Sequence, residues 1–177
     1  MSGRASRGDV LRVQLPLLDR LLDDKPDSSS DPALTAGEAL AVLRRSVRRD
    51  LEALLNAQRS WRSWPARFGE LKTSAVGYGI PDFTAGALND PGRREQLRAE
   101  VEATIRRFEP RFASLRVIAA EQPRDEREPR LRLRIEALLR TEPAPEPVAF
   151  DTVVDATSAA VSVREQDGLA SWDDDHV

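Results

Sequence analysis

One long apolar stripe constrains the fold of this chain more than any other feature. Six aliphatic residues recur at intervals of three and four: Leu40, Leu43, Val47, Leu51, Leu54 and Leu55. This spacing places them on one face of an α-helix, which must bury that face against a second layer. Thr35 and Glu38 have the spacing of a capping box, so the helix is predicted to start at Thr35 and to continue to about Ala57.

Four arginines lie on the sides and back of this predicted helix: Arg44, Arg45, Arg48 and Arg49. A run of charges on a helix is usually a solvated face, and we weight this interpretation above a specific acidic partner. Arg48 and Glu52 have the i,i+4 spacing at which an ion pair forms along a helix.

A second helix is predicted to start at Asp90-Pro91, because aspartate is a favoured N-cap and proline a favoured first helical residue. Its inward stripe consists of Leu97, Val101, Thr104, Ile105 and Phe108. Pro110 cannot continue a helix and restricts Glu109 to extended backbone, so the helix is predicted to end at about Phe108. The segment Glu109-Pro110-Arg111 therefore forms a sharp corner after the helix.

The second half of the chain has the pattern of strands. Residues 130–137 alternate strictly between charged and apolar, which predicts a strand with one buried face. Shorter strand patterns cover 115–119, 148–154 and 160–163, and the charged segment 122–129 is predicted to be a hairpin loop. Helices followed by strands predict an α+β fold, with two main helices on one face of a three- to four-stranded, mostly antiparallel sheet.

The predicted domain covers residues 35–164, between a flexible N-terminal arm (1–34) and an acidic C-terminal tail (165–177). Within the arm, residues 17–23 are predicted to form a short amphipathic helix. We slightly favour this helix as a cover over the domain core, with a docking segment for another subunit as the alternative. The acidic, Ser/Pro-rich stretch 23–32 is predicted to be a linker.

Two segments between the helices resemble sites but are interpreted as structural. Trp61, Trp64, Phe68 and Leu71 are expected to form an aromatic satellite of the core. The segment Tyr78-Gly79-Ile80-Pro81-Asp82-Phe83 needs unusual φ values at glycine and is interpreted as an ordered structural loop. Its glycines do not open onto a helix with a lysine, so a phosphate-binding loop is disfavoured.

Composition excludes several kinds of chemistry. The chain has no cysteine and one histidine, His176, so thiolate nucleophiles, the usual zinc sites and histidine-based general base catalysis have no residues to support them. With 27 basic against 30 acidic residues, net charge −3, nucleic acid is not expected as a partner. No apolar run is long enough for a membrane span, and the cytoplasm is the expected compartment.

Carboxylate pairs could in principle support glycoside hydrolysis, with Glu109 and either Asp82 or Asp90 as the pair to consider. Arg111 beside Glu109 would lower the pKa of that carboxyl group, which is the wrong direction for a general acid. Enzyme activity is therefore weighted well below a structural role, and no cofactor or metal is expected.

Four short segments, in order along the chain, resemble the TssE family of type VI secretion baseplate wedge subunits. They are Leu17-Leu18-Asp19-Arg20-Leu21, Ser46-Val47-Arg48-Arg49-Asp50-Leu51-Glu52-Ala53-Leu54-Leu55-Asn56, Tyr78-Gly79-Ile80-Pro81-Asp82-Phe83 and Ile105-Arg106-Arg107-Phe108-Glu109-Pro110-Arg111. The resemblance as a whole covers roughly residues 15–163. A second Glu-Pro-Arg, at Glu128, Pro129 and Arg130, lacks a preceding helix and is treated as coincidental.

The resemblance implies an α+β structural protein in a cytoplasmic baseplate docked at the inner face of the cytoplasmic membrane, beside the subunits TssF, TssG and TssK. It assigns Glu109, Pro110 and Arg111, with Arg107, to a contact with the helical core bundle of the wedge. It also implies that a sheet edge within residues 131–163 starts the polymerisation of the sheath subunits TssB and TssC. The alternatives are a peptidoglycan-cleaving "lysozyme-like" hydrolase and a small non-catalytic adaptor with the same fold.

Overall fold

The structure is a computed structural model that describes residues 15–21, 34–59, 65–82, 90–120, 130–155, 158 and 160–166. Its helices are α1 (Leu17–Leu21), α2 (Ala36–Asn56) and α3 (Pro91–Phe108), with 3₁₀ segments η1 (Ala66–Thr73) and η2 (Ala75–Gly77). Its strands are β1 (Gln58–Arg59), β2 (Ile80–Pro81), β3 (Phe112–Ala119), β4 (Arg130–Leu139), β5 (Glu146–Asp155) and β6 (Val161–Glu165).

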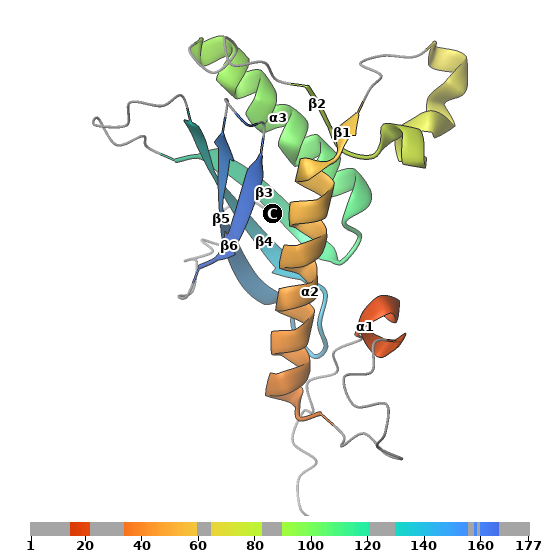
Figure 1. Cartoon of the computed structure of the whole chain (residues 1–177). Coiled ribbons are helices and arrows are strands. Elements are labelled where there is room, and N and C mark those ends of the chain that lie inside the picture. The colour runs from red at the N-terminus through yellow and green to blue at the C-terminus, as the bar shows by residue number, and fades with distance from the viewer. Residues whose placement is uncertain are drawn as a thin grey trace, which may run out of the picture.

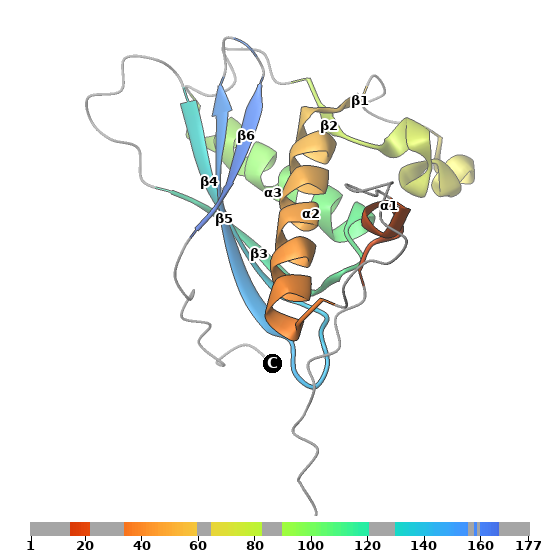
Figure 2. The same ribbon diagram turned by 60° about the horizontal axis from the view of Figure 1, so that its bottom comes forward.

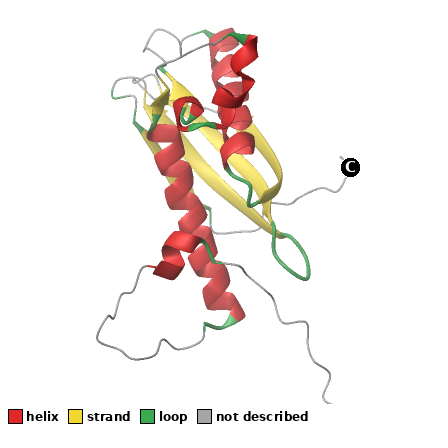
Figure 3. Cartoon of the chain, turned by 90° about the vertical axis from the view of Figure 1, so that its right-hand side faces the viewer, coloured by secondary structure: helices red, strands yellow, loops and turns green. Residues whose placement is uncertain are grey.

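Two layers make up the fold, and Figures 1 and 2 show α2 and α3 lying across the same face of the main sheet. That sheet has the strand order β3-β4-β5-β6, and every neighbouring pair is antiparallel. Viewed from the side of the helices, the strands lie behind them (Figure 3). The predicted α+β class, with two main helices on one face of an antiparallel sheet, is confirmed.

The core fills the space between the helices and the sheet. Alternate residues of β4, from Leu131 to Leu139, are at most 2% exposed and face the helices, as the alternation predicted. The stripe of α2 supplies five of the buried residues, Leu43, Val47, Leu51, Leu54 and Leu55. Leu97, Val101, Thr104 and Ile105 are buried on α3, and Phe108 packs against the core while partly buried.

Both long helices begin where their caps predict. The Thr35 side chain and the Glu38 side chain form both halves of a capping box at the start of α2. Asp90 caps α3 by accepting a hydrogen bond from the Gly92 N–H, and Pro91 is the first helical residue. The confirmed caps fix the direction in which each helix leaves its preceding segment.

The strand β3 begins at Phe112, three residues before the predicted start. Phe112 pairs with Leu139 immediately after the corner, and the register shifts between Phe112 and Ser114. The irregularity hides the alternation at the start of the strand. The predicted hairpin loop 122–129, including Glu128 and Pro129, lies outside the described residues.

The loop between α2 and α3 approaches the end of α2 closely. Gly79 has φ +95, which confirms the unusual backbone predicted there. The Ile80 N–H donates to the Ala57 carbonyl over 3.0 Å, and β2 pairs with β1 in parallel. Strands of two residues have no period to detect, so the sequence could not predict this pairing.

The expectation of an aromatic satellite is wrong at Phe68, which is 46% exposed and stacks under the Arg67 guanidinium 4.6 Å from the ring centroid. Trp61 and Trp64 lie outside the described residues. In the part of the chain that the structure describes, no helix is long and apolar enough to cross a membrane.

Candidate protein-binding site

The corner after α3 is built by its own sequence. Glu109 is the C-cap of α3 with φ −115 and ψ 83, and its N–H donates to the Ile105 carbonyl over 2.8 Å. Pro110 forces this exit from helical backbone. The turn brings Glu109, which is 5% exposed, to the inner side of the corner, while Pro110 is exposed.

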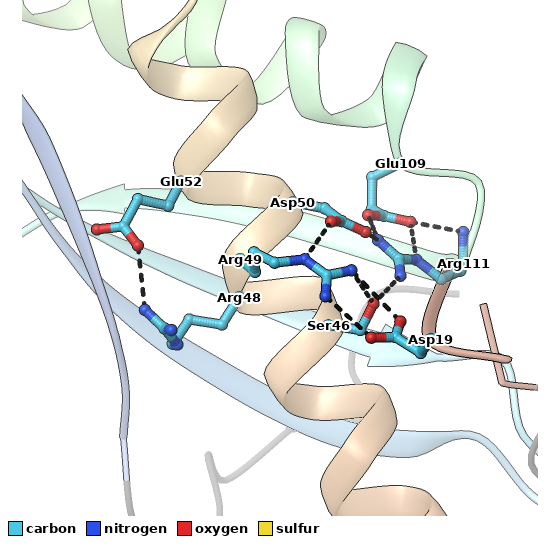
Figure 4. Close-up of polar contacts among 8 residues, drawn as sticks. All are labelled: Asp19, Ser46, Arg48, Arg49, Asp50, Glu52, Glu109 and Arg111. Carbon is cyan, nitrogen blue, oxygen red and sulfur yellow. Dashed lines mark hydrogen bonds and ion pairs between the residues drawn. The ribbon is translucent and has the colours of Figure 1, made fainter. Parts of the chain in front are cut away.

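The carboxylate of Glu109 is clasped by Arg111. The Arg111 backbone N–H donates to Glu109 Oε1 over 3.1 Å, and its Nε donates to the same oxygen over 2.6 Å. Its Nη2 donates to Glu109 Oε2, completing a two-pronged contact of guanidinium with carboxylate. Both charges of the corner are therefore held in one fixed geometry (Figure 4).

Arg111 also connects the corner to α2. Its Nη2 donates to Asp50 Oδ2 over 2.8 Å, and its Nη1 donates to Ser46 Oγ over 3.2 Å. Asp50 in turn accepts from Arg49 Nε over 3.1 Å. One guanidinium thus joins two elements that are far apart in the sequence.

Arg49 extends the same network to α1. Its Nη1 and Nη2 donate to the two carboxylate oxygens of Asp19, over 2.9 and 3.3 Å, and Nη2 also donates to Ser46 Oγ over 3.1 Å. Figure 4 shows Asp19, Ser46, Arg49, Asp50, Glu109 and Arg111 meeting on one side of α2. We call these six residues the corner network.

Burial and the contacts of the corner network shift the pKa of Arg111, Asp19 and Tyr78. Burial disfavours the charged guanidinium of Arg111, but hydrogen bonds to Glu109 and Asp50 outweigh burial and raise its pKa. The hydrogen bond from Arg49 holds the pKa of Asp19 below its ordinary value. Burial, together with the charges of Asp50 and Glu109, raises the pKa of Tyr78, so its hydroxyl stays protonated.

A pocket of about 370 Å³ opens beside the corner network. Its lining is mixed: Pro16, Asp50, Leu54, Tyr78, Phe108, Glu109, Pro110 and Arg111. Tyr78 and Phe108 meet edge to face, with ring centroids 5.3 Å apart and an interplanar angle of 73°. The pocket thus combines an apolar aromatic wall with charged groups that are already oriented.

The helix α1 lies beside α2, away from the main sheet (Figure 1). None of its residues is buried, and its three leucines are 53% to 71% exposed. The expectation that this segment covers the core is therefore wrong, because its leucines face away from the domain. Leu22 and Asp23, included in the predicted helix, lie outside the described residues.

The structure brings some of the predicted site residues together and separates others. Glu109, Pro110, Arg111 and Tyr78 all line the pocket, whereas Gly79, Pro81 and Asp82 do not. Arg107 is half-buried and forms no ion pair with the residues that the structure describes. Phe83 lies outside the described residues.

Sequence reasoning missed Asp19, Ser46, Arg49 and Asp50 as members of this site. The arginines of α2 were expected to be solvated, but Arg44 binds Glu146 over 2.9 Å and Arg49 binds Asp19. The predicted pair of Arg48 and Glu52 is confirmed, with 3.1 Å between Nη1 and Oε2. The arrangement suits protein recognition, because it presents fixed charges beside an apolar wall.

The chemistry of a carboxylate pair finds no support here. Neither Asp82 nor Asp90 lines the pocket with Glu109. Both oxygens of Glu109 accept hydrogen bonds from Arg111, whereas a general acid must carry a proton on one of them. Among the described residues, no group of three or more Asp, Glu, His or Cys is placed to hold a metal ion.

The two edges of the main sheet differ. Side chains of α3 occupy the outer edge of β3: Arg98 Nη1 donates to the Val117 carbonyl over 2.8 Å, and Arg106 Nη2 donates to the Leu115 carbonyl over 3.1 Å. The Val117 N–H donates to Glu102 Oε2 over 3.3 Å. The backbone of this edge is therefore occupied at Leu115 and Val117.

At the outer edge of β6, side chains of α2 reach the backbone of Val161 and, by a longer contact, the backbone of Val163. Asn56 exchanges two hydrogen bonds with the backbone of Val161. Antiparallel pairing with β5 leaves the backbone of Val163 and Glu165 facing outward. The Val163 carbonyl accepts a longer hydrogen bond, 3.4 Å, from Arg48 Nη1.

Comparison with known families identifies the class of protein. The family model described as "Baseplate wedge protein gp25" matches residues 41–144, which is more than half of the chain and includes the corner. The chain belongs to this family of structural baseplate components. A search among curated proteins found no match.

Proposed function

We propose that this chain is a TssE-type wedge subunit of a type VI secretion baseplate, with a structural and not a catalytic role. Its partners would be the baseplate subunits TssF, TssG and TssK and the sheath subunits TssB and TssC. It would act in the cytoplasm, in a baseplate docked at the inner face of the cytoplasmic membrane. Membership of the baseplate wedge family supports the class, and the ordered motifs of the sequence support the particular subunit.

The observation that carries the proposal is the corner held by Arg111. Its guanidinium binds Glu109 and Asp50 at once, so the corner is fixed before any partner arrives. Charged groups fixed in advance lose little conformational entropy on binding. The corner, with Arg107 beside it, would contact the helical core bundle of the wedge through this rigid surface.

The test is co-purification of the chain with co-expressed TssF and TssG. Arg107→Ala and Pro110→Ala are the informative variants, since neither side chain forms a hydrogen bond in the corner network. We expect both to reduce the recovered complex at least fivefold. The melting temperature should stay unchanged in Arg107→Ala, whereas Pro110→Ala also removes the restriction on the Glu109 backbone. Arg45→Ala, an exposed arginine elsewhere on α2, is the matched control. Full recovery of the complex with both corner variants would refute the anchor.

The second part of the proposal concerns the sheath. The outward backbone of β6, from Val163 to Glu165, would accept a strand from the first sheath ring by strand addition. The side-chain contacts to the backbone of β3 at Leu115 and Val117 support this choice of edge, because a strand needs N–H and C=O groups that are free to pair. At β6 the added strand would have to displace the longer contact of Arg48 with the Val163 carbonyl.

A proline at Glu165 tests this edge, since proline removes the outward N–H. The Glu165 N–H points away from β5, so the ladder inside the sheet is retained. Glu165→Pro should abolish sheath assembly on reconstituted baseplates, scored by electron microscopy. Glu165→Ala, which keeps the N–H, is the control. Normal sheaths with Glu165→Pro would exclude strand addition at β6.

A further inference from the structure

We propose that the leucine face of α1 and the adjoining pocket form one docking surface, whose occupant is a partner segment with a basic residue among apolar side chains. The inference rests on the proposed function, because it describes how the corner site would take its partner. We call this surface the α1 docking surface. It consists of Leu17, Leu18 and Leu21 together with the pocket residues.

The apolar part of the α1 docking surface is exposed, and none of the helices and strands that the structure describes covers it. Leu17 is 68% exposed, Leu18 is 53% exposed and Leu21 is 71% exposed. Positions i, i+1 and i+4 of a helix share one side, so the three side chains form a single apolar patch. A patch of exposed leucines on a short helix marks an interaction site more often than isolated apolar residues do.

The patch is held in place beside the pocket. Pro16, directly before α1, lines the pocket. Asp19 is anchored by both terminal nitrogens of Arg49, whose Nε donates to Asp50, another pocket residue. Because Asp19 holds the helix from the inner side, its leucines are directed away from α2. The helix α1 has no buried residue, yet an ion pair anchors it to α2. Its apolar side is therefore available to a partner protein.

The net charge of the pocket indicates which charge the partner segment carries. Three charged residues line the pocket, Asp50, Glu109 and Arg111, which leaves one negative charge in excess. The remaining charged members of the network, Asp19 and Arg49, neutralise each other. Asp50 is 39% exposed, so a partner guanidinium or ammonium can reach its carboxylate. A lysine or arginine with its aliphatic stem against Tyr78 and Phe108 fits both the charge and the apolar wall.

The same charge argues against a second copy of this chain as the occupant. Two copies joined through their leucine faces would bring two pockets of the same net charge together. Like charges at an interface disfavour association. A partner with apolar residues around one cation meets no such repulsion.

Binding of co-expressed TssF and TssG to full-length chain tests the apolar part. The triple variant Leu17→Ser, Leu18→Ser, Leu21→Ser should reduce the affinity at least tenfold. The control triple Leu34→Ser, Phe68→Ser, Val76→Ser removes apolar side chains that are 45% to 48% exposed elsewhere. Equal loss with both triples, or no loss with the first, overturns the inference. If the first triple variant binds normally while Arg107→Ala does not, the result supports the corner as the wedge contact and contradicts the α1 docking surface.

A photo-crosslinking residue in place of Leu18 tests the occupant. Mass spectrometry of the crosslinked wedge complex should locate the product on a partner segment with a lysine or arginine within two helical turns. An acidic segment at that position would overturn the charge argument. A crosslink to a second copy of this chain would overturn the choice of partner.

Asp50→Asn tests the charge of the pocket. The variant should weaken binding to TssF and TssG several-fold without preventing folding, and unchanged affinity would count against the proposal.

Discussion

The side chain of Asn56 pairs with the backbone of Val161 in the way that a neighbouring strand would. Asn56 Nδ2 donates to the Val161 carbonyl over 2.7 Å, and the Val161 N–H donates to Asn56 Oδ1 over 2.9 Å. The last residue of α2 thereby occupies the edge of β6 at its first residue. Strand addition would have to start beyond this point and displace the longer contact of Arg48 with the Val163 carbonyl.

Replacing Asn56 with alanine should destabilise the domain by about 1 to 2 kcal/mol, because two backbone groups of Val161 lose their partners. Urea denaturation measures the change. Hydrogen exchange at the Val161 amide should accelerate in the same variant. Asn56→Asp is the matched control, since it keeps the acceptor for the Val161 N–H. An unchanged Val161 exchange rate in Asn56→Ala would contradict the assigned pairing.

Arg111→Ala should destabilise the fold by about 3 kcal/mol, because it leaves the buried carboxylate of Glu109 without its partner. Adding Glu109→Gln to that variant should restore part of the loss, as a neutral amide is easier to bury than a charge. Arg107→Ala, in the last turn of α3, should stay within about 0.5 kcal/mol of the unchanged protein. Chemical denaturation compares the three. Equal stability of Arg111→Ala and Arg107→Ala would contradict a structural role for the corner network.

Substitution by alanine should change the stability of the fold in opposite directions at Gly79 and at Gly37. A Cβ at Gly79 would lie 2.1 Å from the Ala57 carbonyl oxygen, on a backbone with φ +95. Gly79→Ala should therefore cost at least about 2 kcal/mol. Gly37 lies in α2 with nothing within 4 Å of an added Cβ, so Gly37→Ala should gain up to about 1 kcal/mol of helix propensity. Thermal denaturation of both variants checks the pair, and a tolerated Gly79→Ala would contradict the close approach.

Local signals explain how much of the fold could be predicted. The stripe of α2 and the alternation of β4 repeat with the period of their own backbone, so burial follows from sequence alone. The corner was predictable because Pro110 acts on its immediate neighbour Glu109. Its network was not, since Asp50 lies 61 residues from Arg111 and Asp19 lies 30 residues from Arg49. Charges on a helix have no period that distinguishes a solvated arginine from a paired one.

The attachment of α1 should depend on pH through Asp19. Its pKa in the folded protein is lowered, chiefly by the hydrogen bond from Arg49. A lowered pKa means that the carboxylate contributes stability above the unfolded pKa of about 3.9 and loses it as the pH falls through the folded pKa. At pH 7, Asp19→Asn should cost up to about 1 kcal/mol, because the pair is partly exposed. The difference between the two proteins should shrink steadily below about pH 4, measured by urea denaturation at each pH.

The double variant Asp19→Asn, Arg49→Gln isolates this pair from other carboxylates that titrate in acid. The interaction free energy from the double-mutant cycle should be constant between about pH 5 and 8 and should approach zero once Asp19 is protonated. Protease cleavage next to Leu17 or Leu21 gives an independent readout, because α1 buries none of its residues and depends on Asp19 for its position. Cleavage should be faster in Asp19→Asn than in the unchanged protein at pH 7, and this difference should disappear in acid. A cleavage rate equal in both proteins at pH 7 would mean that Asp19 does not hold α1 on the domain.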